Sequence, residues 1–204
     1  MGYHRAGFEV VGVDIKPQPH YPFEFHQADA LTFPLDGFDA IHASPPCQGY
    51  SIGALNSGSV KAASPRLIRD VRARLIASGR PWVIENVNGA RGEMRDTPEG
   101  YFVLCGLMFS DDVPRRHRLF EASPFLWPPA HPQCRGHNKR LAARLGVDRR
   151  SVEVASVHSE DYELWRVLMG MPWADAAGLS LAVPPAYTEW VGRQLLASLE
   201  SVAA

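Results

Sequence analysis

The stretch Phe38-Asp-Ala-Ile-His-Ala-Ser-Pro-Pro-Cys-Gln48 combines a short strand pattern with a candidate reactive residue, and it is the part of the sequence that is most informative about the fold. Residues 38–43 are mostly apolar and predict a short strand, which Pro45 and Pro46 then stop, because proline cannot donate to a strand ladder. Cys47 follows on a loop that the two prolines stiffen. Open α/β sheets place ligands just beyond the carboxyl ends of parallel strands. We therefore treat Cys47 as a candidate reactive thiol, with an incidental cysteine in a turn as the alternative.

On either side of this stretch, short apolar strands alternate with helical patterns. Residues 2–7 resemble the last turn of a helix that ends at a glycine. Strands are predicted at residues 9–14, 23–27 and 81–85, and a helix that starts at Ser64-Pro65 and ends at Gly79. Strands that alternate with a helix predict an α/β domain with a mainly parallel sheet.

Composition limits the classes of protein that this chain can belong to. The 204 residues are 46% apolar and 21% charged, with a net charge of -1, which is typical of a soluble globular domain. We expect no membrane span or secretion signal, because no run of eighteen or more apolar residues occurs. Three widely spaced cysteines do not form a disulfide framework, so we expect a reducing, cytosolic compartment.

The stretch from about Phe125 to Ala155, here called the basic segment, departs from the balanced charge of the whole chain. It has six basic residues against two acidic ones, which suits contact with phosphates. Two more helices are predicted after it, from about Ser159 to Met169 and from Pro185 to Ser201.

Polar residues at strand ends are the next candidates for function. Asp14 and Asp29 can accept hydrogen bonds from ribose hydroxyls at such positions, although a loop cap is the commoner role of a single aspartate. Glu85 and Asn86 end the strand at 81–85 and can exchange protons or hydrogen bonds with a heterocycle. In Arg116-His117-Arg118, alternation along a strand turns both arginines to one face, where they suit a phosphate or a carbonyl oxygen.

His131, Cys134 and His137 are spaced by two intervening residues each, which is compatible with metal ligation. Zinc would need a fourth ligand, and no second paired cluster occurs nearby in the sequence. We therefore expect no metal site and interpret this stretch as a loop of the basic segment.

The ordered set of motifs resembles the DNA cytosine-5 methyltransferase family, in particular its short bacterial and phage-type members. Ser44 to Gln48 resembles the Pro-Cys loop of the family, and Glu85-Asn86-Val87 its Glu-Asn-Val element. Arg116-His117-Arg118 resembles the end of its Gln-x-Arg-x-Arg element. Residues 165–172 and 183–185 resemble its late motifs. The resemblance covers nearly the whole chain except the basic segment, which lies where the family has its variable target-recognition region.

The resemblance implies a Rossmann-like S-adenosylmethionine-dependent methyltransferase sheet with a small inserted recognition region. It divides the chain into a catalytic α/β core at 1–121, a target-recognition region at 122–157, and returning C-terminal helices at 158–204. It implies double-stranded DNA as partner, S-adenosyl-L-methionine as cofactor, and the cytoplasm of a bacterium or a phage-infected host as location. The residues implied are catalytic Cys47, Glu85, Arg116 and Arg118; cofactor-binding Asp14, Ile15, Asp29, Ala30 and Pro45; and substrate-binding Gln48, Asn86, Arg135, Lys139, Arg140, Arg149 and Arg150.

The implied reaction is a methyl transfer to C5 of cytosine through a covalent adduct with Cys47. In that reading Glu85 contacts N3 and the exocyclic amine of the base, and Arg118, with Arg116 assisting, holds the base carbonyl. Such enzymes serve in restriction-modification systems or as solitary phage functions.

Two departures from the family pattern bear on activity. Family members open with a strand and a glycine-rich Asp-x-Phe-x-Gly-x-Gly turn that wraps the methionine part of the cofactor, and this chain begins just after that point. The missing strand is expected upstream or from a second chain, or the protein is inactive. Pro114 occupies the position of the family's glutamine before the arginine pair.

Three alternatives remain at the level of sequence. A thymidylate-synthase-like enzyme also uses a Pro-Cys thiolate on a pyrimidine, but the basic segment and Glu85-Asn86-Val87 disfavour it. A transfer-RNA cytosine-5 methyltransferase shares the same motifs. A fragment that binds DNA without methylating it would account for the absent glycine-rich turn.

Overall fold

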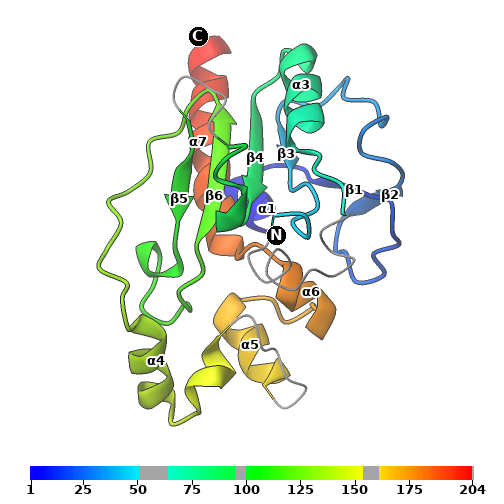
Figure 1. Ribbon diagram of the computed structural model, residues 1–204. Helices are drawn as coiled ribbons and strands as arrows, with labels where there is room; N and C mark the ends of the chain where they lie inside the picture. The colour runs from blue at the N-terminus through cyan, green and yellow to red at the C-terminus, as the bar shows by residue number, and fades with distance from the viewer. Residues whose placement is uncertain (51–63, 95–99, 154–160, 204) are drawn as a thin grey trace. The chain divides into compact units, whose positions relative to one another are not determined.

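A computed structural model describes residues 1–50, 64–94, 100–153 and 161–203. Its strands lie in the first part of the chain, and a mainly helical C-terminal part follows them (Figure 1). The strands are β1 Val11–Asp14, β2 Glu24–Gln27, β3 Ile41–Ala43, β4 Trp82–Asn86, β5 Phe102–Leu104 and β6 Arg118–Ser123. The helices are α1 Gly2–Ala6, α3 Ile68–Ser78, α4 His137–Leu145, α5 Tyr162–Met169, α6 Ala176–Leu181 and α7 Pro185–Ala203, with short 3-10 helices η2 Asn88–Ala90, η3 Gly106–Met108 and η4 Arg149–Val152.

The chain divides into two compact units. Unit 1 comprises Met1–Gln27, Cys105–Arg116 and Pro129–Arg193. Unit 2 comprises Ala28–Leu104, His117–Pro128 and Gln194–Ala204. These units are compact pieces of the fold, and the predicted division of the chain by role stays a prediction.

Unit 1 holds a two-stranded parallel sheet, in which β1 pairs with β2 from Val11 opposite Glu24 to Asp14 opposite Gln27. The short helix α1 ends at Gly7, whose positive φ of 111° is one that glycine adopts without strain. Helix α1 packs closely against the beginning of α7, since a Cβ on Gly2 would overlap the Pro185 carbonyl oxygen.

The helices of unit 1 bury two small apolar clusters. The first joins α4, η4 and α5 through Leu141, Val152 and Leu168. The second joins α5 and α6 through Trp165 and Leu179. Each cluster is only a few side chains across, so α4 and η4 depend on a narrow apolar face and expose most of their other residues.

Unit 2 is built on a four-stranded sheet in the order β3-β4-β6-β5. Strands β3 and β4 are parallel, with Ile41 opposite Trp82. Strand β6 runs antiparallel to both β4 and β5. The expectation of a mainly parallel sheet is therefore wrong for this unit. The reason is that β6 follows β5 through a return of the chain rather than through a crossover helix, and such returns give antiparallel pairing.

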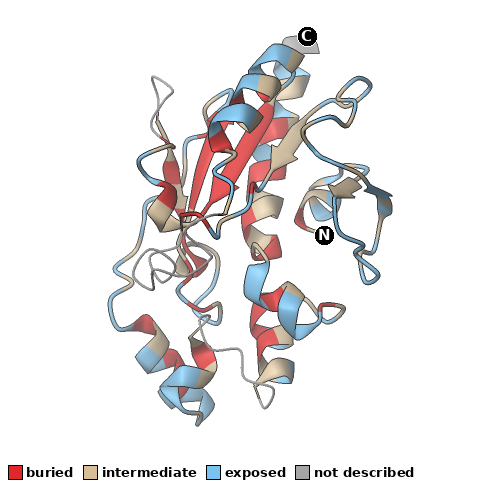
Figure 2. Ribbon diagram, turned by 45° about the vertical axis from the view of Figure 1, so that its right-hand side comes forward, coloured by how far each residue is buried: buried red, intermediate tan, exposed pale blue. Residues whose placement is uncertain are grey.

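Helix α3 covers the core of unit 2. Ile68, Arg72 and Leu75 are its buried residues, at the spacing of one helical face, and the helix ends at Gly79 with a φ of 65°. It begins three residues after the predicted Pro65, and Leu67 rather than Ser64 precedes its first residue. The apolar core beneath it includes Trp82 and Ile84, and β4 is buried along its whole length (Figure 2).

The structure confirms an α/β architecture with a mixed sheet and several helices. The predicted helix at 185–201 is confirmed as α7, and the predicted helix near 159–169 as α5, although Ser159 lies outside the described residues. No helix in the described ranges is long and apolar enough to span a membrane.

Candidate functional site

The loop after β3 presents Cys47 on a fixed backbone. The backbone N–H of Tyr50 donates to the Cys47 carbonyl oxygen at 3.0 Å and closes a turn around the thiol. Pro45 is buried, Cys47 is partly buried and Gln48 is exposed. On the strand side, Nε2 of His42 lies 3.0 Å from the Ser44 hydroxyl, and loss of hydration lowers the pKa of His42 to about 4. The imidazole is therefore neutral at physiological pH, and no cation is introduced at the base of this loop.

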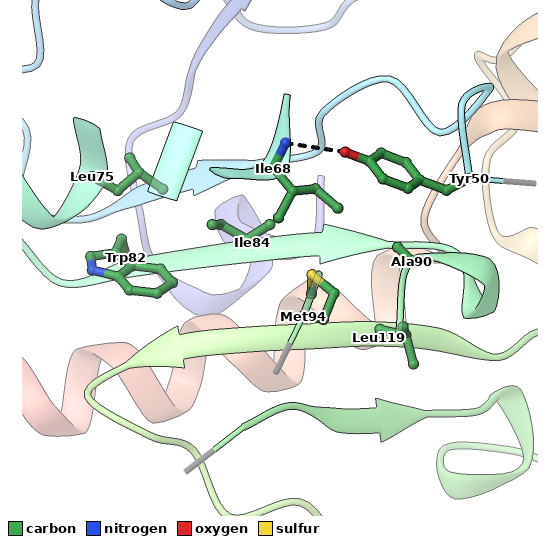
Figure 3. Close-up of a cluster of buried hydrophobic side chains, with 8 residues drawn as sticks. All are labelled: Tyr50, Ile68, Leu75, Trp82, Ile84, Ala90, Met94 and Leu119. Carbon is green, nitrogen blue, oxygen red and sulfur yellow. Dashed lines mark hydrogen bonds between the residues drawn. The ribbon is translucent and has the colours of Figure 1, made fainter. Parts of the chain in front are cut away.

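Tyr50 anchors the far side of the loop in the core of unit 2 (Figure 3). Its side chain is fully buried, its hydroxyl donates to Glu93 at 2.9 Å, and it accepts the backbone N–H of Ile68 at 3.3 Å. The Arg66 guanidinium pairs with Glu93 at 2.9 Å and lies 4.9 Å from the centre of the Tyr50 ring. Burial raises the pKa of Tyr50, so it stays protonated as a donor. The Cys47 turn is thus attached to a rigid support three residues downstream.

The end of β4 lies beside this loop because β3 and β4 are parallel neighbours. Glu85 and Asn86 are both buried. The Asn86 side-chain amide donates to the Pro45 carbonyl oxygen at 2.9 Å, and its oxygen accepts the backbone N–H of Val87 at 2.9 Å. Asn86 therefore ties the end of β4 directly to the Pro-Cys loop.

Arg118 reaches the same edge from the beginning of β6. Because β6 is antiparallel to β4, its first residues lie where β4 ends, and Leu119 is opposite Asn86. The Arg118 guanidinium pairs with the Glu85 carboxylate, with Nε 3.0 Å from Oε1 and both side chains largely buried. We call this arrangement of Cys47, Glu85, Asn86 and Arg118 the Cys47 edge.

A second buried ion pair supports the sheet of unit 2 from the helix side. Arg72 of α3 donates to both carboxylate oxygens of Glu121 in β6, each at 2.6 Å, and the Glu121 side chain has no exposed surface. Arg72 also donates to the Glu93 carbonyl oxygen at 2.5 Å. This pair is absent from the sequence predictions. A charged residue at an apolar position of a helix, with another in an apolar strand, was the signal available in the sequence.

Arg116 has partners in unit 1. It is buried, its guanidinium donates to the Ser180 carbonyl oxygen at 2.8 Å, and its own carbonyl oxygen accepts the Tyr187 hydroxyl at 2.5 Å. Strand β6 begins at Arg118, so the strand alternation predicted for the two arginines does not extend to Arg116. Arg118 is the arginine that the structure places in contact with Glu85.

The predicted cofactor residues of unit 1 lie at the carboxyl end of β1. Asp14 accepts the backbone N–H of Lys16 at 2.8 Å and the side-chain amide of Gln18 at 3.2 Å, which orients the carboxylate in a turn. Ile15 next to it is 68% exposed.

The other predicted cofactor residues belong to unit 2. Asp29 follows β2 by two residues and accepts the backbone N–H of Leu31 at 2.8 Å. Ala30 lies in the same turn, where its carbonyl oxygen accepts Arg74 at 2.7 Å. Pro45, the last of the set, belongs to the Cys47 loop through its bond with Asn86.

A hollow of about 500 Å³ in unit 1 lies away from these residues. It is lined by His4, Phe8 and residues that precede β1 and β2, such as Glu9 and Phe23. It thus lies at the amino ends of the two parallel strands, whereas ligands of open α/β sheets lie at the carboxyl ends. We do not assign the predicted cofactor to this hollow.

The basic segment folds in part as α4 and η4, which were not predicted, whereas residues 131–136, predicted as a loop, lie outside any helix or strand. All five of its predicted substrate-binding residues are exposed: Arg135, Lys139, Arg140, Arg149 and Arg150. Arg149 pairs with Glu153 at 2.9 Å on the surface. His137 begins α4 and points inward, with Nε2 3.0 Å from the Val113 carbonyl oxygen, and burial lowers its pKa.

Comparisons of the chain with family models, with curated proteins and with solved structures gave no match. The site is therefore interpreted from its own geometry. A thiol on a rigid loop, a buried carboxylate paired with an arginine and a fixed amide can together hold a planar heterocycle for nucleophilic attack.

Proposed function

We propose that this protein is a DNA cytosine-5 methyltransferase with a Rossmann-like core, in which Cys47 is the nucleophile. The observation that carries the proposal is the Cys47 edge. Glu85 and Arg118, far from Cys47 in sequence, meet at the carboxyl ends of β3 and β4, and Asn86 ties the β4 end to the Pro-Cys loop. This is the edge at which an α/β enzyme is expected to hold its substrate.

The residues at the end of β1 suit the adenosine part of S-adenosyl-L-methionine. The Asp14 carboxylate lies at a strand end where ribose hydroxyls can donate to it, and the exposed Ile15 offers an apolar surface for the adenine ring. Asp29 and Ala30, in the turn after β2, are the next residues that we assign to this cofactor. When bound, S-adenosyl-L-methionine would supply an electrophilic methyl group.

The chemistry assigned to Cys47 is addition to C6 of cytosine. Attack by the thiolate forms a sulfur–C6 bond and moves the electrons of the C5–C6 double bond onto C5, which then becomes nucleophilic. Once C5 carries the methyl group, loss of the C5 proton and cleavage of the sulfur–C6 bond restore the double bond and release Cys47.

Glu85 and Arg118 are assigned to the Watson–Crick side of the same base. The buried Glu85 carboxylate can accept a hydrogen bond from the exocyclic amine, and in its protonated form the carboxyl group can donate its proton to N3, which draws electrons away from C6 and favours attack. Arg118 orients Glu85 through the 3.0 Å ion pair and can donate to the base carbonyl oxygen. Asn86 fixes the Cys47 loop to the end of β4, where Glu85 lies, through its hydrogen bond to the Pro45 carbonyl oxygen.

Duplex DNA as substrate is supported by the basic segment. C6 of a stacked cytosine is inaccessible, so the base must leave the helix at a cost of a few kcal/mol. The exposed Arg135, Lys139 and Arg150 provide charge for phosphates while the base is extruded.

Covalent trapping tests the proposal. Duplexes of random sequence that contain 5-fluorocytosine should form a stable adduct in the presence of S-adenosyl-L-methionine, because fluorine at C5 leaves no proton to remove. Mass spectrometry should locate the adduct on Cys47, and the Cys47→Ser variant should form none. Arg118→Lys should slow trapping by about 10²-fold or more, as expected when a preorganised charged donor is lost, whereas Arg115→Lys on the exposed surface should not.

Each outcome of this experiment decides part of the proposal. An adduct with 5-fluorocytosine transfer RNA in preference to duplex DNA would assign the enzyme to RNA. No adduct with either substrate, or an adduct that survives Cys47→Ser, would overturn the catalytic role.

A further inference from the structure

Four potential metal ligands come together outside the Cys47 edge. Within unit 1, the Sγ atoms of Cys105 and Cys134 and a ring nitrogen of His131 all lie within 4.8 Å of one another. His117 belongs to the same group. Two thiols and two imidazoles are the donor set that proteins use for tetrahedral zinc.

The pairing of β5 with β6 brings Cys105 and His117 together. Leu104 and Arg118 are partners in this antiparallel pair. Cys105 directly follows Leu104 and His117 directly precedes Arg118, so the two residues occupy the next opposing positions. Their closeness is a consequence of the strand register.

The other two ligands come from the loop before α4. His131 and Cys134 are separated by two residues, a spacing common in zinc-binding loops. The sequence expectation of no metal counted only His131, Cys134 and His137. The structure directs His137 to the Val113 carbonyl oxygen, while Cys105 and His117, from a distant part of the sequence, complete the set.

The surroundings of Cys105 suit a metal-bound thiolate. The residue is fully buried, and the backbone N–H of Met108 donates to its sulfur. Hydrogen bonds of this kind orient and stabilise thiolate ligands in metal sites. His131, by contrast, is exposed, which gives the ion a path of entry.

We propose that Cys105, His117, His131 and Cys134 bind one zinc ion in a structural site. Ligand atoms around tetrahedral zinc are about 3.3–3.8 Å apart, so an inward shift of about 1 Å closes the set. Four protein ligands leave no position for water or substrate, which distinguishes a structural ion from a catalytic one.

A disulfide between Cys105 and Cys134 is the competing use of the same neighbours. Neither of these two cysteines forms a disulfide in the structure. A protein with bound zinc contains the metal and two reduced thiols at these positions, whereas a protein with the disulfide contains neither. Metal analysis and a thiol count on one preparation therefore distinguish the two states.

Metal analysis of the full chain, purified without chelator, is the first measurement. We expect about one zinc per chain, and replacement by cobalt should give the visible absorption of a tetrahedral site with thiolate ligands. Zinc content should fall below about a tenth in Cys134→Ser and His131→Asn, since loss of even an outer-shell partner weakens binding about 10–100-fold. The matched controls Cys47→Ser and His20→Asn should keep the zinc.

Three results would overturn the proposal. A metal-free protein that takes up no cobalt, or equal zinc content in Cys134→Ser and Cys47→Ser, would exclude the site. So would a Cys105–Cys134 disulfide detected by alkylation before reduction. The proposal is independent of the methyltransferase assignment, because Cys47→Ser should abolish the DNA adduct and leave the zinc in place.

Discussion

The Cys47 edge and the basic segment both present charged side chains, yet they hold them in opposite ways. At the Cys47 edge, Glu85 and Arg118 are largely buried, paired with each other and located at strand ends. In the basic segment, the arginines and the lysine lie exposed on a small helical piece with a narrow apolar core. The difference fits the tasks we assign: attack on a ring carbon requires fixed positions, whereas attraction of phosphate requires charge near the surface.

The largest effect should come from breaking the buried pair that supports the sheet behind the Cys47 edge. Arg72→Met leaves Glu121 buried without its partner and should lower the free energy of unfolding by about 3–5 kcal/mol. Arg149→Ala breaks an exposed pair with Glu153 and should cost less than about 0.5 kcal/mol. Urea unfolding of the two variants measures both values.

The double variant Arg72→Met/Glu121→Leu refines this test. Removal of both charges should recover most of the stability, because a well-packed apolar pair often replaces a buried ion pair. If Arg72→Met and Arg149→Ala lowered the free energy of unfolding by similar amounts, burial would not account for a difference in stability between the two ion pairs.

A smaller effect should appear as a pH dependence of the stability of unit 2. Loss of hydration holds the pKa of His42 near 4 in the folded chain, against 6.5 when unfolded. Its contribution is therefore fully present above pH 6.5 and is lost as the pH falls towards 4, by up to about 1.4 kcal/mol per pH unit. His42→Gln should flatten this dependence, while His20→Gln, on an exposed residue, should leave it unchanged. A profile that is identical in wild type and His42→Gln would contradict the assignment to His42.

The smallest effect should follow from changes in the basic segment. Arg149→Ala/Arg150→Ala should reduce DNA affinity and lower the slope of log affinity against log salt by about two units, one for each phosphate that the protein no longer neutralises. Adduct formation at saturating DNA should remain, because neither residue belongs to the Cys47 edge. Unchanged affinity and slope would show that these arginines do not contact DNA.

The sequence predicted local features better than long-range ones. Strand patterns located β1 to β4, and proline at a helix start located α7, because these signals are contained in a few neighbouring residues. The reversal of β6 was missed, since strand direction depends on how the chain returns to the sheet. Helix α4 was missed because its apolar face is reduced to Leu141 and Ala142 among charged residues.

For the predicted site, too, the sequence indicated individual residues but not the long-range contacts between them. Cys47, Glu85, Asn86 and Arg118 were proposed from motif order, and the structure brings them to one edge. The contacts that hold them, such as Asn86 with Pro45 and Arg72 with Glu121, join residues more than forty positions apart, and no local pattern specifies such pairs. The group of cysteines and histidines was missed for the same reason, because its members come from three separate stretches of chain.

The Arg72–Glu121 pair also has a consequence for how this protein can evolve. The two positions are 49 residues apart, yet a change at either one alone leaves the other charge buried without its partner. Lineages that have lost the arginine should therefore have lost the glutamate as well, and intermediates with a single change should be rare. A collection of descendants of the same ancestor should show these two positions changing together, whereas Arg149 and Glu153 should drift independently.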